Sequence, residues 1–466
     1  MNIHSSQSAV KLLALSACLM LSGCAASDRV VTETVAPATP HQATVQGMVH
    51  GGQQPVTGAS VYLFAAGTLG YANPATSLLN TADTGVATDA AGNGYVTTTP
   101  NGGFNITGLY SCPSSSTQVY IAATGGNPGL SAGTNNSALS LIAALGACGN
   151  LNSNTFITIN EVTTVASVWA LAPFMGGASA LGSTPSNTAG LSTAFASVSQ
   201  LANTANGSAS GPSLPAGATL PVGEINTLAN ILAACVNTTG GVAGDGSPCG
   251  NLFAAATPSN GIAPADTVGA AINIAQNPGA SVAALFNIVA ASGPFQPTLT
   301  SAPTDWTIAV QYTGLGLSNP SSVAIDGAGN VWITNCGSAN CATSGAGSVT
   351  QLNGNGVLVG STSAGGINGP LAVAIDLSGN AWIANYYGNS ISELNSSLSP
   401  VAGPFTGGGI NGPNSLAISN NGNVWINNLA NGTASELNSS GGAVSGTSGY
   451  TISGASGLDA IVLSPH

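Results

Sequence analysis

Positive charge is almost absent from this chain of 466 residues. Lys11 and Arg29 are its only basic residues, against 14 Asp and Glu. Proteins that bind nucleic acid place several Lys or Arg side chains at the phosphates, so this composition excludes a nucleic-acid partner. A polybasic membrane patch is excluded for the same reason. Solubility must instead come from Asn, Ser and Thr side chains and from backbone amides.

Histidine is scarce as well, which limits the catalytic chemistry open to the chain. The histidines are His4, His41, His50 and His466. None is placed to complete a Ser-His-Asp set, so we expect no such triad. The glycine-rich strings are interpreted as turns, because no helix with a Lys follows them as a phosphate loop requires.

The N-terminus has the pattern of an export signal. Lys11 precedes the apolar run LLALSACLML, which is too short to span a bilayer but fits a signal-peptide core. The run leads into LSGC at Cys24, a motif that resembles the signal of bacterial lipoproteins, in which this Cys is acylated. The resemblance implies a signal peptide over residues 1–23, lipidation of Cys24 and a tether over 24–42. By analogy with enterobacterial sorting, Ala25 favours the outer membrane; an ordinary secretory signal is the alternative.

The remaining cysteines support export. The chain has eight Cys, and those outside the signal region fall into couples close in sequence. We predict the disulfides Cys112–Cys148, Cys235–Cys249 and Cys336–Cys341. Metal binding is the alternative, although the sequence contains no CxxC and no nearby His. An oxidising compartment favours disulfides.

Residues 43–126 predict a β-sandwich. Runs such as ATVQGMVHGG and QVYIAATGG alternate in polarity, and Gly, Pro and Asn turns separate them. The order of Gly47–Val49, Pro55–Leu63 and Asn101–Ile106 resembles the prealbumin-like domain of carboxypeptidase regulatory modules. The resemblance implies a spacer or binding module rather than a catalyst, with an insertion over residues 68–96.

Residues 127–297 change to a helical period and predict a small Ala-rich bundle. Thr158 and Glu161 have the spacing of a capping box, and apolar residues then recur at helical spacing. Further helical runs follow, one of them with Asp266 as its expected N-cap. None is long enough to cross a membrane.

An internal repeat governs residues 298–466. Its copies NPSSVAIDGAGNVWITN, GPLAVAIDLSGNAWIAN and GPNSLAISNNGNVWINN place Trp332, Trp382 and Trp425 in one setting. Each copy predicts a four-stranded blade, and such a period indicates a β-propeller. The predicted fold class is therefore multidomain: a β-sandwich, a small α-helical bundle, and an incomplete β-propeller of three blades plus a fragment.

The repeat resembles the NHL-repeat propellers and, more broadly, the streptogramin lyase and gluconolactonase-like group. The pattern P-x-x-V-A-I-D-x-x-G-N-x-W-I-x-N is met in the first copy and nearly so in the second, whereas the third has Ser419 in place of the Asp. In that group, lyases use a catalytic His with acidic metal-binding partners, and lactonases bind a divalent metal. No complete copy here contains a His, so we carry over no catalytic residue, no metal ligand and no cofactor.

The repeated residues have structural explanations. Asp accepts amide hydrogen bonds in a turn and Gly there can take a positive φ, which accounts for Asp326, Gly329, Asp376, Gly379 and Gly422. We expect the three Trp side chains to pack between blades, with stacking on a sugar ring as the alternative. Glu393 and Glu436 are interpreted as surface strand residues rather than metal ligands.

The sequence ends in LDAIVLSPH, where a fourth copy begins. Three blades and a fragment cannot close a propeller, so we expect a truncated product, with completion by another copy as the alternative. Two functions fit the sequence. One is a non-catalytic protein, anchored to the cell envelope by its lipid, that presents the propeller to a protein or glycan ligand. The other is a lyase or lactonase-type enzyme whose catalytic residues lie beyond His466.

Overall fold

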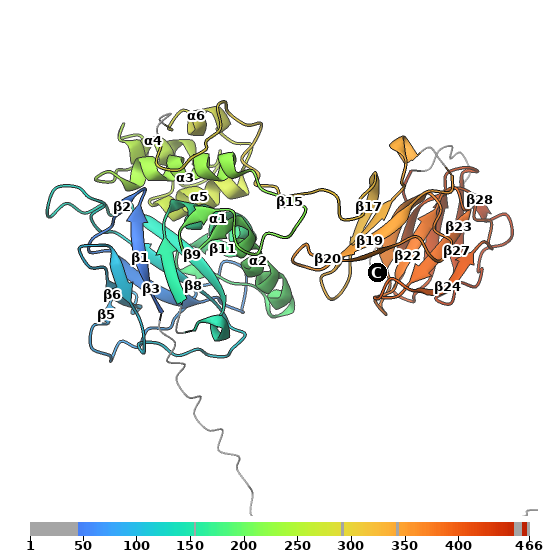
Figure 1. Ribbon diagram of the computed structural model, residues 1–466, viewed down its shortest axis with the longest axis horizontal. Coiled ribbons are helices and arrows are strands. Elements are labelled where there is room, and N and C mark those ends of the chain that lie inside the picture. The colour runs from blue at the N-terminus through green and yellow to red at the C-terminus, as the bar shows by residue number, and fades with distance from the viewer. Residues whose placement is uncertain (1–44, 153–154, 290–292, 342–343, 452–458, 464–466) are drawn as a thin grey trace, which may run out of the picture. The chain divides into compact units, whose positions relative to one another are not determined.

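The computed structural model describes residues 45–152, 155–289, 293–341, 344–451 and 459–463. The predicted signal peptide, Cys24 and the tether lie outside these residues. The described chain forms N-terminal β-sheets, a central helical region, and then three four-stranded antiparallel sheets that resemble propeller blades (Figure 1). The predicted fold class is therefore confirmed.

Two sheets form the N-terminal part. In the first, β1 (Val45–Gly51) pairs in parallel with β10 (Thr155–Ile159) and antiparallel with β2 and β7. In the second, the strand order is β5-β6-β3-β8-β9, and β4 pairs with β3. The remaining strands are β2 Gln54–Pro55, β3 Ser60–Ala65, β4 Thr76–Ser77, β5 Ala87–Thr88, β6 Gly94–Thr97, β7 Gly103–Asn105, β8 Gln118–Thr124 and β9 Ser140–Ala147.

Alternating polarity explains how the sheets pack. In β1, Val45 and Val49 are buried and face the second sheet, where Leu63 and Ile121 lie in the same hydrophobic core. The opposite face of the second sheet is also buried, because Tyr120 and its neighbours pack against the helices. The second sheet is thus the middle layer between a sheet and a layer of helices.

Two of these strands lie within the region whose sequence predicts the helical bundle. The strand β9 pairs with β8, and β10 pairs with β1 across more than a hundred residues of chain. The apolar run of β9 is buried at most positions. A strand buried on both faces loses the two-residue alternation, so its sequence resembles that of a buried helix.

The helical region begins directly after β10. Asn160 caps α1 (Glu161–Leu171) through its side chain, and Thr163 completes the capping box, so the box predicted for Thr158 and Glu161 is wrong. Asp266 caps α5 (Thr267–Gln276), as expected. The other helices are α2 Thr188–Leu201, α3 Val222–Val236, α4 Pro248–Ala255 and α6 Val282–Phe286. Over the described residues, no helix combines the length and apolar character needed to cross a membrane.

Short strand pairs and disulfides fix the connections. The structure contains the disulfides Cys112–Cys148, Cys235–Cys249 and Cys336–Cys341, which are the three predicted pairings. A cross-link removes conformations from the unfolded chain, so each stabilises the segment it closes. The short strands are β11 Met175–Gly177, β12 Ala180–Leu181, β13 Ala202–Asn203, β14 Ser208–Ala209, β15 Ala218–Thr219 and β16 Gln311–Tyr312.

Each blade is a sheet whose strands follow the order of the sequence. The first contains β17 Pro320–Ile325, β18 Val331–Asn335, β19 Ser348–Leu352 and β20 Leu358–Thr362. The second contains β21 Pro370–Ile375, β22 Ala381–Asn385, β23 Ser390–Leu394 and β24 Pro400–Phe405. The third contains β25 Pro413–Ile418, β26 Val424–Asn428, β27 Thr433–Leu437 and β28 Tyr450–Thr451.

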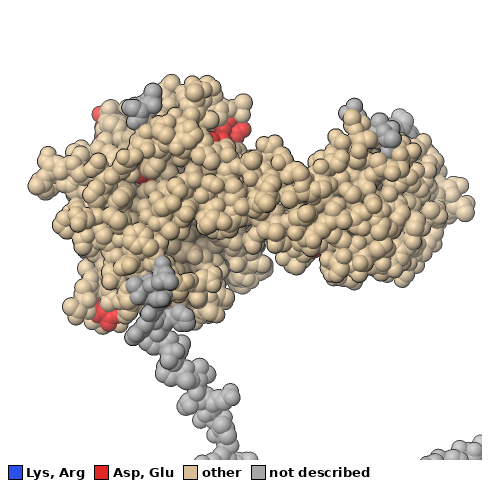
Figure 2. Space-filling model, in the orientation of Figure 1, with Lys and Arg blue, Asp and Glu red and all other residues tan. Residues whose placement is uncertain are grey.

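The surface carries little charge. On the face shown in Figure 2, the exposed charges are scattered acidic residues. Both basic residues of the chain precede the first described residue, so no carboxylate is paired with a Lys or Arg among the described residues. Buried carboxylates must therefore be stabilised by neutral hydrogen-bond donors.

Glu161 is the most deeply buried of these carboxylates. It opens α1 and is inaccessible to solvent, and its two carboxylate oxygens lie 2.8 and 3.0 Å from the Gly52 amide, which donates to them. Burial disfavours the charged form and raises the pKa of Glu161 to about 8, although the hydrogen bonds from the backbone oppose the rise.

We predict that Glu161 makes folding less favourable as the pH rises. The unfolded chain loses this proton near pH 4.5 and the folded chain only near pH 8, so the stabilisation is complete below the first value and lost between the two. In that window the stability of wild type should fall relative to Glu161→Gln by about 1.4 kcal/mol per pH unit. Urea unfolding followed at a helix-sensitive wavelength measures this difference. Parallel pH curves for the two proteins would contradict it.

Candidate functional site

The repeated Asp of the first two blades joins a turn to the Trp of the next strand. One oxygen of Asp326 accepts the amides of Ala328 and Asn330, each at 2.9 Å, and the other accepts the indole N–H of Trp332 at 3.0 Å. Burial alone would raise the pKa of Asp326, but the bonds from Trp332, Asn330 and the backbone amides outweigh it and lower the pKa. The carboxylate is thus held in its charged form by neutral donors.

The second blade repeats this arrangement. Asp376 accepts the amides of Ser378 and Asn380 and, at 3.0 Å, the indole N–H of Trp382. The glycine that closes each turn has a positive φ, with values of +84° at Gly329, +82° at Gly379 and +83° at Gly422. A residue with a Cβ is strained in this conformation, which explains the recurrence of glycine.

The third blade lacks the carboxylate. Ser419 turns its hydroxyl to Asn421 and to the carbonyl of Asn423 instead. Trp425 is half-buried and stacks on Tyr450, with ring centroids 5.7 Å apart. In the third blade, the repeated Trp is therefore held by stacking on a Tyr rather than by a hydrogen bond to an Asp.

Two of the Trp side chains are buried between blades. Trp332 shares a hydrophobic cluster with Val373 and Ile383 of the second blade. Trp382 shares another with Leu416 and Ile426 of the third blade. Each Trp thus covers the first two strands of the blade that follows.

The two repeated glutamates are buried, so their interpretation as surface residues is wrong. Glu393 is 5% exposed and Glu436 is 8% exposed. Glu393 accepts the side-chain amide of Asn380 at 2.9 Å, and Glu436 accepts that of Asn423 at 2.7 Å and the hydroxyl of Tyr450 at 2.9 Å. Burial raises the pKa of Glu393 despite the bond from Asn380, and the nearby Asp376 adds to the rise. Both glutamates therefore accept hydrogen bonds from donors within their own blades.

The two ends of the blades differ in their connections. At one end the strands are joined by short turns, in which Asp326, Asp376, Asn353, Asn395 or Asn438 accepts amides two and four residues ahead. At the other end lie the connections between the second and third strands and those between successive blades. We call this the loop end. Binding residues are commonly carried on such varied loops above a rigid scaffold.

A buried Asn holds each set of loops at this end. Asn385 accepts the amide of Asn368 at 3.2 Å and donates to the hydroxyls of Ser390 and Ser392 at 3.4 and 2.8 Å. Ser392 in turn donates to the carbonyl of Gly365 at 2.6 Å. The equivalent residues Asn335 and Asn428 make the same kinds of bonds. The sequence interpretation missed these residues, although an Asn three positions after each Trp was a visible signal.

Two adjacent tyrosines stand on the loop end of the second blade. Tyr386 and Tyr387 are half-buried and meet edge to face, with ring centroids 5.0 Å apart. Gly369 leaves room for the ring of Tyr387, because a Cβ there would lie 2.4 Å from it. The Gly369 carbonyl also accepts the Tyr386 amide at 3.0 Å. The pair is therefore held on a fixed backbone.

The loops of neighbouring blades are joined to one another. The Gly412 amide donates to the side chain of Asn389 at 2.7 Å, and the Gly345 amide donates to that of Asn368 at 2.6 Å. On the first blade, the disulfide Cys336–Cys341 closes the start of the corresponding loop. The loop end is thus a cross-linked surface rather than a set of independent loops.

No family model and no curated protein matches the chain. Among solved structures, it is similar to virginiamycin B lyase from Staphylococcus aureus, with 15% identity, 25% of this chain and 37% of that chain covered, and a TM-score of 0.19. A protein of unknown function from Bacteroides caccae gives 20% identity, coverage of 26% and 46%, and a TM-score of 0.21. A chain of a nidogen/laminin complex is 12% identical, with 29% of this chain and 49% of that chain covered and a TM-score of 0.22. The match spans less than half of each of these chains.

The described residues contain no group of three or more His, Cys, Asp or Glu that could hold a metal ion. The predicted lipidation site, Cys24, lies outside them. The structural similarity covers only part of the chain, and the similar proteins are propeller proteins that include a lyase.

We predict that exchanging the turn residues of two blades shifts stability in opposite directions. Asp376→Ser removes the carboxyl group that accepts the indole N–H of Trp382 and should cost about 1–3 kcal/mol. Ser419→Asp supplies the missing acceptor for Trp425 and should stabilise by about 1 kcal/mol. Urea unfolding followed by Trp fluorescence measures both changes. A destabilising Ser419→Asp would show that the Asp–Trp bond does not carry the effect.

A second prediction compares the Val that occupies the same repeat position in the first and second blades. Val373 is 8% exposed beneath Trp332, whereas Val323 in the first blade is 63% exposed. Val373→Ala should lower the free energy of unfolding by about 1.6 kcal/mol, since two buried methyl groups are lost. Val323→Ala is the matched control and should change it by less than about 0.5 kcal/mol. Equal losses would mean that both positions are buried in solution.

Proposed function

We propose that this chain is a non-catalytic binding protein of the cell envelope, which presents the loop end of its blades to a protein ligand. The observation that carries the proposal is the use of the blade carboxylates. Asp326, Asp376, Glu393 and Glu436 all accept hydrogen bonds from donors within their own blades. A catalytic or metal-binding carboxylate must instead face its substrate or ion.

The composition of the loop end supports a protein as the ligand. Its loops consist largely of Asn, Ser and Gly around Tyr386 and Tyr387. Surfaces that bind proteins use this combination, because Tyr supplies a large contact area at low entropic cost and Asn, Ser and Gly supply adaptable hydrogen bonds. A glycan is the other ligand class that the sequence allows.

Export and anchoring belong to the same proposal. The LSGC motif at Cys24 supports acylation, and the three disulfides fit an oxidising compartment outside the cytoplasm. A lipid on Cys24, with the polar tether that follows it, would hold the folded part at the outer membrane. In this proposal the chain contacts the membrane only through that lipid.

A photo-crosslinker in place of Tyr386 tests the binding surface. Introduced in the producing cells, it should give a discrete adduct with one exported protein. The control position is Leu377, which is 87% exposed in a short turn at the opposite end of the same blade, and it should give no adduct. Tyr386→Ala with Tyr387→Ala should weaken binding of the captured partner at least tenfold, as expected for a pair of aromatic anchors.

Two outcomes would contradict the proposal. One is an equal adduct from positions 377 and 386, or none from position 386. The other is turnover of quinupristin, the compound found with a catalytically inactive form of virginiamycin B lyase. Turnover by the purified full chain would favour the lyase alternative.

A further inference from the structure

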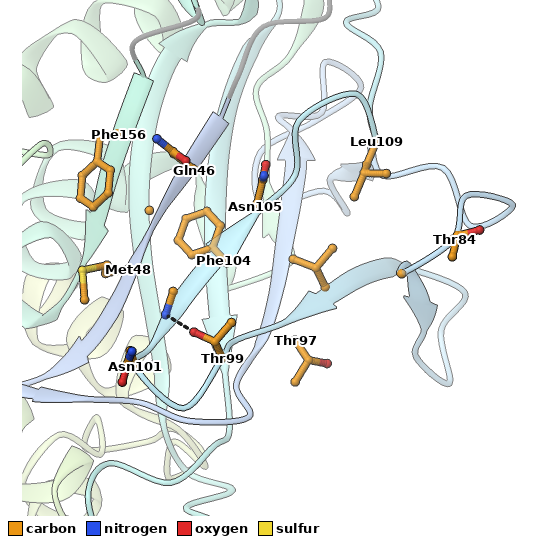
Figure 3. A pocket seen from close by; sticks show the side chains of 14 residues that line it. Gln46, Met48, Thr84, Thr97, Thr99, Asn101, Phe104, Asn105, Leu109 and Phe156 are labelled. Carbon is orange, nitrogen blue, oxygen red and sulfur yellow. Dashed lines mark hydrogen bonds between the residues drawn. The ribbon is translucent and has the colours of Figure 1, made fainter.

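A groove of about 670 Å³ lies on the N-terminal part of the chain (Figure 3). It is lined by residues of β1, β6, β7 and β10 and by the turns beside them. Sites for small ligands commonly have volumes of about 300–1,000 Å³. The groove is therefore large enough to hold a ligand of several rings.

The strand register places a row of side chains across this groove. Gln46 of β1 lies opposite Phe156 of β10 on one side and opposite Asn105 of β7 on the other. Val45 and Ile157, next to them in sequence, point into the core, so Gln46 and Phe156 point outward. Neighbouring strands are about 4.8 Å apart, and the row therefore spans about 10 Å. One aromatic ring and two amides thus share one outer face.

A glycine beside this row leaves space in the groove. Gly103 of β7 pairs with Met48 of β1 and has no side chain to fill the groove. Its amide donates to the hydroxyl of Thr99 at 3.1 Å, the bond drawn in Figure 3, and this orients the hydroxyl. Phe104 and Leu109 add apolar surface to the lining.

Among the described residues that line the groove there is no Asp, Glu, Lys, Arg or His. Its polar groups are the amides of Gln, Asn and the hydroxyls of Thr, and its most exposed aromatic ring is Phe156, with 40% of its surface accessible. An exposed ring beside uncharged donors and acceptors suits a ligand with apolar C–H faces and many hydroxyls. These lining residues offer no counter-charge to a charged ligand.

We propose that this groove binds a segment of a neutral polysaccharide, with a sugar ring stacked on Phe156 and its hydroxyls bonded to the amides of Gln46 and Asn105. A peptide added to the sheet edge fits less well. The strand β7 has three residues, so an added strand would form few main-chain bonds. The site is independent of the blades and of the function proposed for them.

Affinity electrophoresis of the full chain tests the groove. Laminarin, xylan and amylopectin in the gel are the neutral probes, and alginate is the charged one. We expect at least one neutral probe to retard the wild type, Phe156→Ala to weaken that binding at least tenfold, and Phe156→Trp to retain it. Leu69→Ala is the matched control, because Leu69 is 85% exposed and lies outside the groove, and it should behave as wild type.

Three results would overturn the assignment: no retardation by any neutral probe, retardation by alginate alone, or equal retardation of wild type and Phe156→Ala. Because the side chain of Phe156 is 40% exposed on the outer face of its strand, Phe156→Ala should remain folded at the assay temperature, with at most a modest fall in the thermal unfolding midpoint. A cooperative unfolding transition well above the assay temperature shows that lost binding comes from the groove and not from unfolding. Gln46→Ala provides a second exposed substitution, with a smaller expected loss.

Discussion

The hydrogen bond from a neutral donor to a buried carboxylate is the interaction on which this structure depends. No Lys or Arg occurs among the described residues, so within this part of the chain a buried acid has no basic side chain as its partner. Glu161 receives the Gly52 amide, Asp266 receives a helix amide, and Asp326 receives an indole and two turn amides. Where these donors are numerous the acid stays charged, and where burial dominates its pKa rises.

The same constraint shapes the blades. Their buried polar groups form networks of Asn, Ser and Thr, which need no counter-ion but require an accurate geometry for every donor and acceptor. Asn385 illustrates this, since its amide contacts the loop that enters the blade and the third strand of the blade together. The polar network thus specifies the loops, while the Trp side chains supply the apolar contact between blades.

Local patterns explain what could be predicted from the sequence. The turn, the Trp and the strands of a blade lie within a few dozen residues, so their repetition indicated three blades and their boundaries. The pairing of β10 with β1 could not be predicted, because it joins segments far apart, and β9 carries no alternation to identify it as a strand. For the same reason the row of Phe156, Gln46 and Asn105 exists only in the folded chain. Glu393 was misjudged because a charge in a strand is usually solvated, and its partner Asn380 comes from a turn of the preceding hairpin.

The Asn at the end of each second strand has a consequence for how this protein can change. It fixes the places where loops leave and re-enter the blade. The hydrophobic core of the blade is built from the strands and not from these loops. Loops between these fixed places can therefore differ in length and sequence without disturbing the packing of the Trp side chains. The first blade already contains such a case, since the loop closed by Cys336–Cys341 is longer than its counterpart at Tyr386. The blades thus form a frame on which new recognition surfaces can be selected or engineered one loop at a time.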